Sequence, residues 1–219
     1  MSSAPPILQV LHEAPGYVAV SKPAGIATEL HYDHDTVAAR AQTLWQRPSS
    51  PQLAFVGIVH RLDRPVGGVL LLARNKSTLR FLNDAFAERK VRKTYVALTA
   101  DPLPQTKGNL RHYLARDASN RRAVAYGEPG SKRTESYLRY RLLGREKGGH
   151  YRYEIQPVTG RFHQIRCQLA AAGAPIVGDM LYGSAVAVGE HLIRLHATAL
   201  SFPDPNGGDL VTVTDKTPF

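Results

Sequence analysis

Two short apolar runs, at residues 54–59 and 69–73, constrain the fold of this chain more than any other feature. Both contain Val, Leu or Ile, and Gly57, Gly67 and Gly68 interrupt or border them. Runs of this length and composition are typical of buried β-strands. The segment between them, residues 60–65, is therefore expected to connect two strands.

That connection places one carboxylate between two guanidinium groups. It reads His60-Arg61-Leu62-Asp63-Arg64-Pro65. In extended backbone Arg61 and Asp63 lie on one side and Leu62 on the other, so we expect Leu62 to point into the core. A neighbouring cation favours the ionised carboxylate, which can then act as a nucleophile or as an orienting charge. The alternative is a structural ion pair at a surface turn.

The rest of the sequence shows many strand patterns and few helical ones. We expect strands at 17–20, 94–98, 137–142, 151–158, 193–200 and 210–213, helices from Asp33 or Asp35 to about Trp45, after Asn75 and from about Phe162, and a loop-like stretch at about 101–132. This pattern predicts an α+β fold around a mixed, largely antiparallel sheet. No linker or repeat divides the sequence, which favours one domain over residues 1–219.

The charge balance favours an anionic partner. The chain has 219 residues and a formal net charge of +10, an excess that attracts RNA, DNA or an acidic membrane surface. No apolar run reaches the ~20 residues of a membrane span, so we expect a cytoplasmic protein. Cys167 is the one cysteine, which excludes an intramolecular disulfide and a site of several thiolates. We expect its thiol to be buried and inert.

A second polar group follows Gly160. Ile165 and Leu169 continue the helical spacing that starts at Phe162. Arg166 lies along the same apolar edge, so its guanidinium is expected to be half buried and to need an anion. Asp63 is one candidate for that anion, and the alternatives are an unrelated acid or a phosphate group.

Several motifs, in the same order along the chain, resemble the RluA family of RNA pseudouridine synthases. They are Lys22-Pro23-Ala24-Gly25, His60-Arg61-Leu62-Asp63-Arg64 with Gly68, Arg92-Lys93-Thr94-Tyr95, Gly160-Arg161-Phe162-His163-Gln164-Ile165-Arg166, Pro175-Ile176-Val177-Gly178-Asp179, Leu181-Tyr182-Gly183 and Leu195-His196-Ala197. The resemblance implies a pseudouridine synthase fold, with a curved, mostly antiparallel mixed sheet flanked by a few helices and loops. It also implies isomerisation of uridine in RNA with no cofactor and no metal. Many relatives carry a small S4-like RNA-binding domain at the N-terminus, and we expect none here because the motif-like sequence begins by about Ile7.

The resemblance assigns roles to individual residues. Asp63 corresponds to the catalytic aspartate, Tyr95 to the tyrosine that packs against the target base, and Arg166 to the arginine that pairs with the aspartate. The substrate-binding residues implied are Arg61, which fills the space left by the flipped base, Leu169, which forms an apolar wall, and His60, Arg64, Lys22, Arg161 and Gln164. The candidates for contact with the RNA backbone are Arg89, Lys90, Arg92, Lys93, Arg121, Arg122, Lys132, Arg133, Arg139 and Arg141.

Two motifs depart from the family pattern. Val66-Gly67 stands where Thr-Ser is common, and Phe162 stands where Thr is usual. Neither change removes a group that the chemistry requires, but adjacent glycines can loosen the loop that carries Asp63.

The expected partner is RNA, with ribosomal RNA of the large subunit as first choice and transfer RNA as second. One alternative is an RNA-binding module of the same fold with little catalysis. Another is a glycoside or nucleoside hydrolase, which requires a second acid such as Glu154 or Asp179. The three histidines His60, His163 and His196 lack the spacing of a metal site. A monomer without an obligate protein partner is expected.

Overall fold

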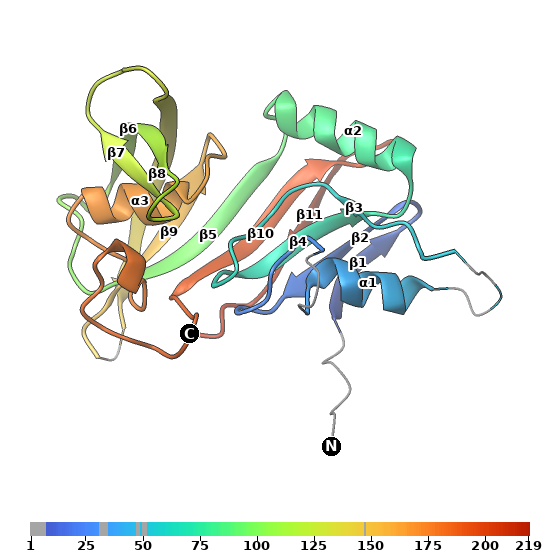
Figure 1. The fold of residues 1–219 in the computed structure, drawn as a ribbon, viewed down its shortest axis with the longest axis horizontal. Helices are drawn as coiled ribbons and strands as arrows, with labels where there is room; N and C mark the ends of the chain where they lie inside the picture. The colour runs from blue at the N-terminus through green and yellow to red at the C-terminus, as the bar shows by residue number, and fades with distance from the viewer. Residues whose placement is uncertain (1–7, 31–34, 47–48, 50–51, 147) are drawn as a thin grey trace. The chain divides into compact units, whose positions relative to one another are not determined.

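A computed structural model describes residues 8–30, 35–46, 49, 52–146 and 148–219 (Figure 1). The chain divides into two compact units. Unit 1 comprises residues up to Arg92 together with Ala197–Pro218, and unit 2 comprises Lys93–His196 with Phe219. The assignment of one domain over residues 1–219 stays a prediction.

Unit 1 is built on a sheet with the strand order β1-β2-β4-β10. The strands are β1 (Gln9–Ala14), β2 (Tyr17–Lys22), β4 (Gly67–Ala73) and the part of β10 (Leu195–Pro203) from Ala197 onward; β3 (Gly57–Ile58) pairs with β4 and β11 (Leu210–Thr214) with β10. All seven residues of β4 are buried. A strand covered on both faces reads as a continuous apolar run, which explains the pattern at 69–73.

The described part of unit 1 contains two helices. Helix α1 (Val37–Trp45) starts at Thr36, whose side chain accepts the N–H of Ala39, and α2 (Lys76–Ala87) starts at Asn75, whose side chain accepts the N–H of Thr78. Both caps satisfy an N–H group that has no partner inside the helix. Leu82 and Ala85 of α2 join Tyr17, Leu71 and Phe202 in the buried core of the sheet.

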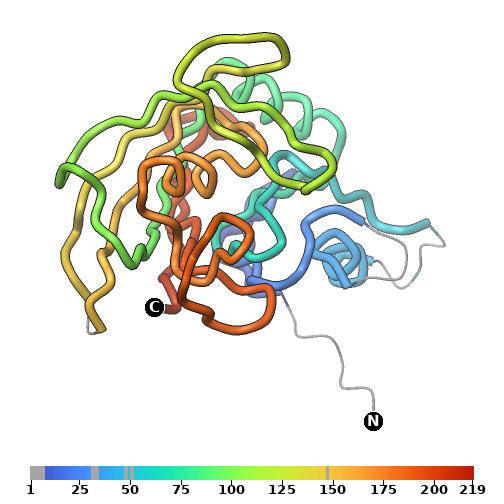
Figure 2. Tube along the Cα trace, turned by 60° about the vertical axis from the view of Figure 1, so that its left-hand side comes forward, coloured from blue at the N-terminus to red at the C-terminus, as the bar shows by residue number. Residues whose placement is uncertain are grey.

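Unit 2 has the strand order β5-β9-β8-β6-β7. Figure 2 traces its backbone in colours that run from green through yellow to orange. The strands are β5 (Arg92–Thr99, in unit 2 from Lys93), β6 (Lys107–Asp117), β7 (Arg122–Tyr126), β8 (Thr134–Arg145) and β9 (Tyr151–Pro157), and each of these neighbours is antiparallel. Helix α3 (Gln164–Ala171) and the 3-10 turn η1 (Met180–Tyr182) complete the unit.

The two faces of the β5-β9-β8-β6 sheet differ in polarity. Residues directly opposite in the register share a face, so Tyr95, Ile155 and Tyr140 lie on one face, and all three are buried. Gln168 of α3 donates to the carbonyl groups of Leu110 and Ser136 beside this face. We call it the helix face. The opposite face carries the exposed side chains of Arg139 and Arg141.

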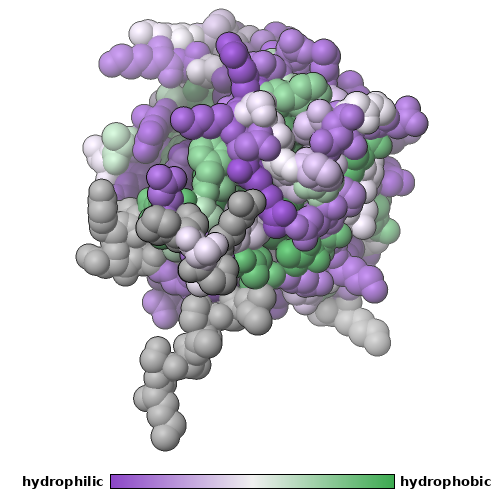
Figure 3. Space-filling view, turned by 90° about the vertical axis from the view of Figure 1, so that its right-hand side faces the viewer, coloured by the Kyte–Doolittle hydropathy of each residue, from purple (hydrophilic) through white to green (hydrophobic). Residues whose placement is uncertain are grey.

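The α+β fold class is confirmed, and most expected elements are present within a few residues. The loop-like assignment of 101–132 is wrong, because it contains β6 and β7; their alternating exposed and half-buried residues give only a weak apolar signal. The strand expected at 54–59 is reduced to Gly57–Ile58. Thr36 caps α1 in place of Asp35, and Asp33 lies outside the described residues. On the face of the molecule in Figure 3, hydrophilic side chains separate smaller hydrophobic areas.

Candidate active site

Asp63 lies on a loop of unit 1 that is hydrogen-bonded to the segment after β2. Asp63 is half-buried, its neighbour Leu62 is buried as predicted, and Arg61 is exposed. The backbone N–H of Val66 donates to the carbonyl of Asp63 at 2.9 Å and closes the turn. A backbone hydrogen bond therefore holds the turn that begins at Asp63.

Lys22, the last residue of β2, also holds this loop. Its Nζ donates to the carbonyls of Val66 at 2.7 Å, Pro23 at 3.0 Å and Arg64 at 3.2 Å. The side chain is among the largest that are fully buried. Burial lowers the pKa of Lys22 to about 7, although the charge of Asp63 opposes that shift. Lys22 therefore fixes the backbone that follows Asp63, at Arg64 and Val66.

Gly25 and Thr28 add four more hydrogen bonds to this loop. Gly25 and Arg64 exchange two, from Gly25 N–H to the Arg64 carbonyl and from Arg64 Nε to the Gly25 carbonyl, each 2.8 Å long. The Thr28 hydroxyl donates to the Leu62 carbonyl at 3.1 Å and accepts the Leu62 N–H at 3.3 Å. Together with Lys22, these contacts hold the loop that ends at Val66, next to Gly67 at the start of β4. Val66 and Gly67 are the positions of this segment that depart from the family pattern.

The other predicted residues of this loop also have internal partners. Arg61 forms an ion pair with Glu29 at 2.8 Å. Nε2 of His60 accepts the N–H of Leu71 at 3.1 Å, and its ring stacks on Phe86. Because β3 ends at Ile58, the His60 ring, and not the backbone of a paired strand, accepts this N–H group of β4. The contacts of Arg61, His60, Arg64 and Lys22 with substrate stay predictions.

In unit 2, Arg166 is held by a two-pronged ion pair with Asp179. Nε lies 2.6 Å from Oδ2 and Nη2 lies 2.9 Å from Oδ1. Both side chains are buried, which makes Arg166 more buried than the expected half-buried state. A carboxylate in this geometry compensates the burial of the guanidinium. Asp179 is the unrelated acid that the sequence left open, and the pairing of Arg166 with Asp63 stays a prediction.

A histidine and a tyrosine extend this ion pair. His163, in the left-handed conformation with φ 51°, precedes α3. Its Nε2 lies 3.1 Å from Nη1 of Arg166, and its Nδ1 lies 3.0 Å from the Tyr182 hydroxyl. That hydroxyl accepts the N–H of Ala123 at 2.7 Å, and burial raises the pKa of Tyr182. Arg166 is therefore oriented by His163, directly before α3, and by Asp179, directly before η1, while Tyr182 of η1 contacts His163.

Tyr95 and Leu169 are both buried in unit 2. Tyr95 is buried on β5 opposite Ile155, and Leu169 of α3 is fully buried. Lys93, two residues before Tyr95, shares its face of the strand. A Cβ atom at Gly160 would lie 3.2 Å from Nζ of Lys93, and burial lowers the pKa of this lysine. Gly160 thus leaves room for the Lys93 amine.

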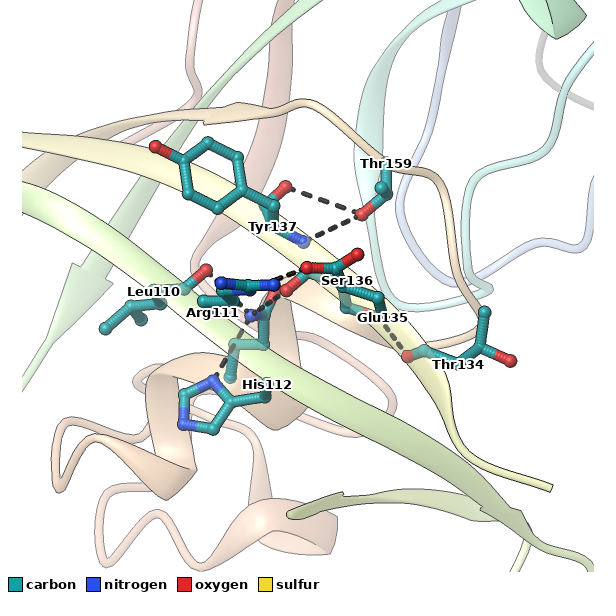
Figure 4. A network of polar contacts seen from close by, with 9 residues as sticks. Leu110, Arg111, His112, Thr134, Glu135, Ser136, Tyr137 and Thr159 are labelled. Carbon is teal, nitrogen blue, oxygen red and sulfur yellow. Dashed lines mark hydrogen bonds and ion pairs between the residues drawn. The ribbon is translucent and has the colours of Figure 1, made fainter. Parts of the chain in front are cut away.

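Gln164 holds the start of α3 in place. Its Oε1 accepts the Thr159 hydroxyl at 2.8 Å and the Arg161 N–H at 3.0 Å, while Nε2 donates to the Tyr137 carbonyl at 3.1 Å. Thr159 also accepts the N–H of Tyr137 (Figure 4). The amide of Gln164 is occupied by the chain itself, and Arg161 is exposed. Their contacts with substrate stay predictions.

The candidates for the RNA backbone are distributed over both units. Arg89, Lys90 and Arg92 belong to unit 1 and the others to unit 2. Lys90 pairs with Glu88, Arg122 with Asp117 and Arg141 with Glu154. Arg133 lies over the Tyr126 ring at 3.6 Å. Exposure of Arg121, Lys132 and Arg139 is compatible with contact to phosphate, which stays a prediction for all ten.

The sequence alone assigned Asp179, Tyr182 and His163 no role in orienting Arg166. All three lie in motifs that carry the family resemblance. These motifs did not indicate that the three residues meet Arg166. Cys167 is buried as expected, and burial raises the pKa of its thiol to about 11. Among the described residues, no group of three or more His, Cys, Asp or Glu is placed to hold a metal ion. No helix in the described ranges has the length and apolar character needed to cross a membrane.

Comparison with known proteins identifies relatives for most of the chain. Residues 16–171 match the family described as RNA pseudouridylate synthase. The dual-specificity RNA pseudouridine synthase RluA of Yersinia pestis is 33% identical over 206 residues, which are 91% of this chain and 94% of that protein. The ribosomal large subunit pseudouridine synthase D of Borreliella burgdorferi is 32% identical over 184 residues, 80% of this chain and 55% of the relative's length.

A solved structure supports the same fold. Human RNA Pseudouridylate Synthase Domain Containing 1 superposes with a TM-score of 0.80 at 24% identity, covering 100% of this chain and 87% of the human one. The motifs, the matched residues and the fold agree with one another. The chain therefore belongs to the RNA pseudouridylate synthase family, and its relatives include proteins named RluA, as the sequence motifs predicted.

Proposed function

We propose that this chain converts specific uridines in RNA to pseudouridine, with Asp63 as the catalytic carboxylate. The observation that carries the proposal is the family match over residues 16–171. The half-buried Asp63, on a loop fixed by Lys22, Gly25 and Thr28, supports it, because a group that acts on a nucleotide must be both reachable and held in position.

The isomerisation breaks the bond between N1 and C1′, turns the uracil and joins C5 to C1′. The proton leaves C5 and N1 gains a proton, so the reaction consumes no other reagent. Asp63 serves either as the group that attacks the base or C1′, or as the base for a glycal route. Tyr95 packs against the base, and Arg166 supplies the positive charge for the carboxylate.

The target uridine must leave its stack before it can react. Unstacking costs a few kcal/mol, which contacts between cationic side chains and the RNA backbone offset. Ribosomal RNA is the proposed first target and transfer RNA the second. The name of the Borreliella burgdorferi relative, which refers to the large ribosomal subunit, supports that order.

Release of tritium from RNA labelled with [5-³H]uridine measures the proposed reaction. Wild type is expected to release tritium, while Asp63→Asn and Asp63→Ala lose activity by at least about 10³-fold at unchanged RNA affinity. Asp84→Asn, an exposed change on α2, is the matched control and should keep full activity. If Asp63→Asn retains activity, the assignment of the aspartate is wrong.

The products distinguish the alternatives. A wild-type protein that binds cellular RNA but releases no tritium would be an RNA-binding module of this fold. Free uracil would indicate a hydrolase. The structure disfavours the second acid that a hydrolase needs, because Asp179 is committed to Arg166 and Glu154 pairs with Arg141. Mapping pseudouridines in a strain that lacks the gene would identify the target nucleotide.

A further inference from the structure

A hollow of about 470 Å³ lies over strands β6, β8 and β9 of unit 2. Its lining comprises Lys107, Gly108, Asn109, Arg139, Tyr140, Arg141, Glu154 and Gln156. The register places these side chains in two rows across the sheet: Lys107, Arg141 and Glu154 in one, and Asn109, Arg139 and Gln156 in the next. Successive rows on one face are two residues apart along each strand.

These rows lie on the face of the sheet opposite Tyr95. Ile155 and Tyr140 share the face of Tyr95. Glu154 adjoins Ile155 on β9 and Arg141 adjoins Tyr140 on β8, so the side chains of Glu154 and Arg141 point to the opposite face. Within unit 2, the hollow therefore lies on the opposite face of the sheet from Tyr95, which is predicted to pack against the target base. A ligand in the hollow would contact the face of this sheet that does not carry Tyr95.

The charges in the hollow are not balanced. The three cations are Lys107, Arg139 and Arg141, and Glu154 is the one acid in the lining, which leaves a net charge of +2. Glu154 pairs with Arg141 at 3.3 Å. Lys107 and Arg139 are exposed and have no ion-pair partner among the described residues. Two cations are thus available to an anion from outside.

The arrangement is unfavourable for the protein alone. Lys107 and Arg141 are directly opposite in the register, and like charges in that position destabilise a sheet. The contrast is Arg111, further along β6, which pairs with Glu135 of β8 at 2.6 Å (Figure 4). A phosphate bound beside Lys107 would relieve this repulsion.

The donors suit phosphate oxygens better than a protein surface. Arg139 lies between the amide side chains of Asn109 and Gln156, and all three offer N–H groups. The exposed residues of the lining are polar, and the aromatic ring of Tyr140 is buried. Protein interfaces are instead centred on exposed aromatic or aliphatic anchors.

We propose that this hollow is a second RNA contact, in which Lys107 and Arg139 bind phosphates of the backbone outside the target nucleotide. The proposal rests on the proposed function for the class of partner, since RNA is the polyanion that the enzyme acts on. Contacts to phosphate position the nucleic acid without reading its sequence. The site therefore adds affinity and register, and the chemistry stays with other residues.

The test combines Lys107→Gln with Arg139→Gln and measures binding of a fluorescent 20-nucleotide oligouridylate at several KCl concentrations. Loss of two phosphate contacts should reduce the slope of log Kobs against log [KCl] by about 1.4, at about 0.7 per contact for a single strand. Kd at low salt should rise at least about fivefold. In the tritium-release assay the loss should fall on KM rather than on kcat.

Two further double variants serve as controls. Lys76→Gln with Arg80→Gln removes the same two charges from exposed positions on α2 and should leave the slope unchanged. Lys107→Arg with Arg139→Lys keeps the charges and should retain the affinity. An unchanged slope in the first double variant, an equal loss in the α2 control, or an equal loss in the charge-preserving variant would each overturn the proposal.

The outcomes also separate this inference from the proposed function. If wild type releases no tritium but the slope falls in the Lys107 and Arg139 variant, the RNA contact stands and the enzymatic proposal fails. If wild type is active and the slope is unchanged, the enzymatic proposal stands and the second contact is wrong.

Discussion

Lys22 is a buried cation whose hydrogen-bond partners are three backbone carbonyls, two of them on the loop of Asp63. Asp179 is a buried anion whose partner is Arg166. At the scale of single residues, these two side chains determine how the predicted catalytic groups are held. Each carries a cost of burial that a measurement of stability can detect.

The stability conferred by Lys22 is expected to rise with pH above neutrality. The unfolded chain holds this proton up to the ordinary pKa of 10.5, whereas the folded protein releases it at about 7, so the unfolded state binds more protons between these values. The free energy of unfolding of wild type relative to Lys22→Met should rise by about 2 kcal/mol from pH 7 to pH 9. Urea titrations at each pH measure it. Lys76→Met, at an exposed lysine, should show no such trend, and a difference independent of pH would contradict the assignment.

Removal of the Asp179 charge is expected to destabilise unit 2 strongly. Asp179→Asn leaves the buried guanidinium of Arg166 without its carboxylate, and breaking a buried pair in this way costs about 3 kcal/mol or more. Glu135→Gln breaks the exposed pair with Arg111 and should cost less than about 1 kcal/mol. Urea denaturation at pH 7 compares the two. Equal losses would show that the ion pair with Arg166 has no special weight.

At the scale of elements, β4 and β10 approach each other closely at one glycine. Gly68 has φ +120°, a conformation that side chains rarely adopt, and a Cβ atom there would lie 2.2 Å from the carbonyl oxygen of Ala197. The close contact involves backbone, which cannot move aside as a flexible side chain can. This explains why a glycine stands at the second position of β4, just after the loop that carries Asp63.

Gly68→Ala is therefore expected to cost more than about 3 kcal/mol of stability. Gly207→Ala is the control, because Gly207 has φ +87° and nothing within 4 Å of its ideal Cβ, so it isolates the backbone strain of about 1 kcal/mol. Thermal and urea unfolding measure both. A cost for Gly68→Ala no larger than that of the control would mean that β4 and β10 can separate at little cost.

At the scale of the whole molecule, the net charge of +10 acts on any polyanion. Cationic residues occur in both units, and many of them pair with acids, as Arg61 does with Glu29 and Arg141 with Glu154. Surface pairs of this kind contribute little to stability. The excess charge is therefore more important for binding than for folding.

Binding of RNA should raise Tm in a salt-dependent way. Poly(U) at 100 times its Kd stabilises the folded protein by about 2.7 kcal/mol, which corresponds to a rise in Tm of about 5–10 °C for a chain of this size. The rise should shrink strongly in 0.5 M KCl, where exposed charges are screened. Dextran, a neutral polymer, is the control. A shift that dextran reproduces, or one that ignores salt, would contradict an electrostatic partner.

Local sequence determined the secondary structure where the apolar pattern was strong. The buried run of β4, the Asn75 cap of α2 and the burial of Leu62 follow from spacing and residue type within a few positions. Where exposed and half-buried residues alternate, as in β6 and β7, the signal was too weak and the strands were missed. The ordered motifs also determined the family.

Only the tertiary structure decided which groups are partners. The contact of Lys22 with Val66 joins residues 44 positions apart, and that of Arg166 with Asp179 joins residues 13 apart. The row of Lys107, Arg141 and Glu154 depends on the register of three strands. A sequence pattern records which face a side chain takes along its own strand or helix. The side chain that it meets across space depends on how the separate elements pack, because that packing satisfies buried charges and hydrogen bonds from distant parts of the chain.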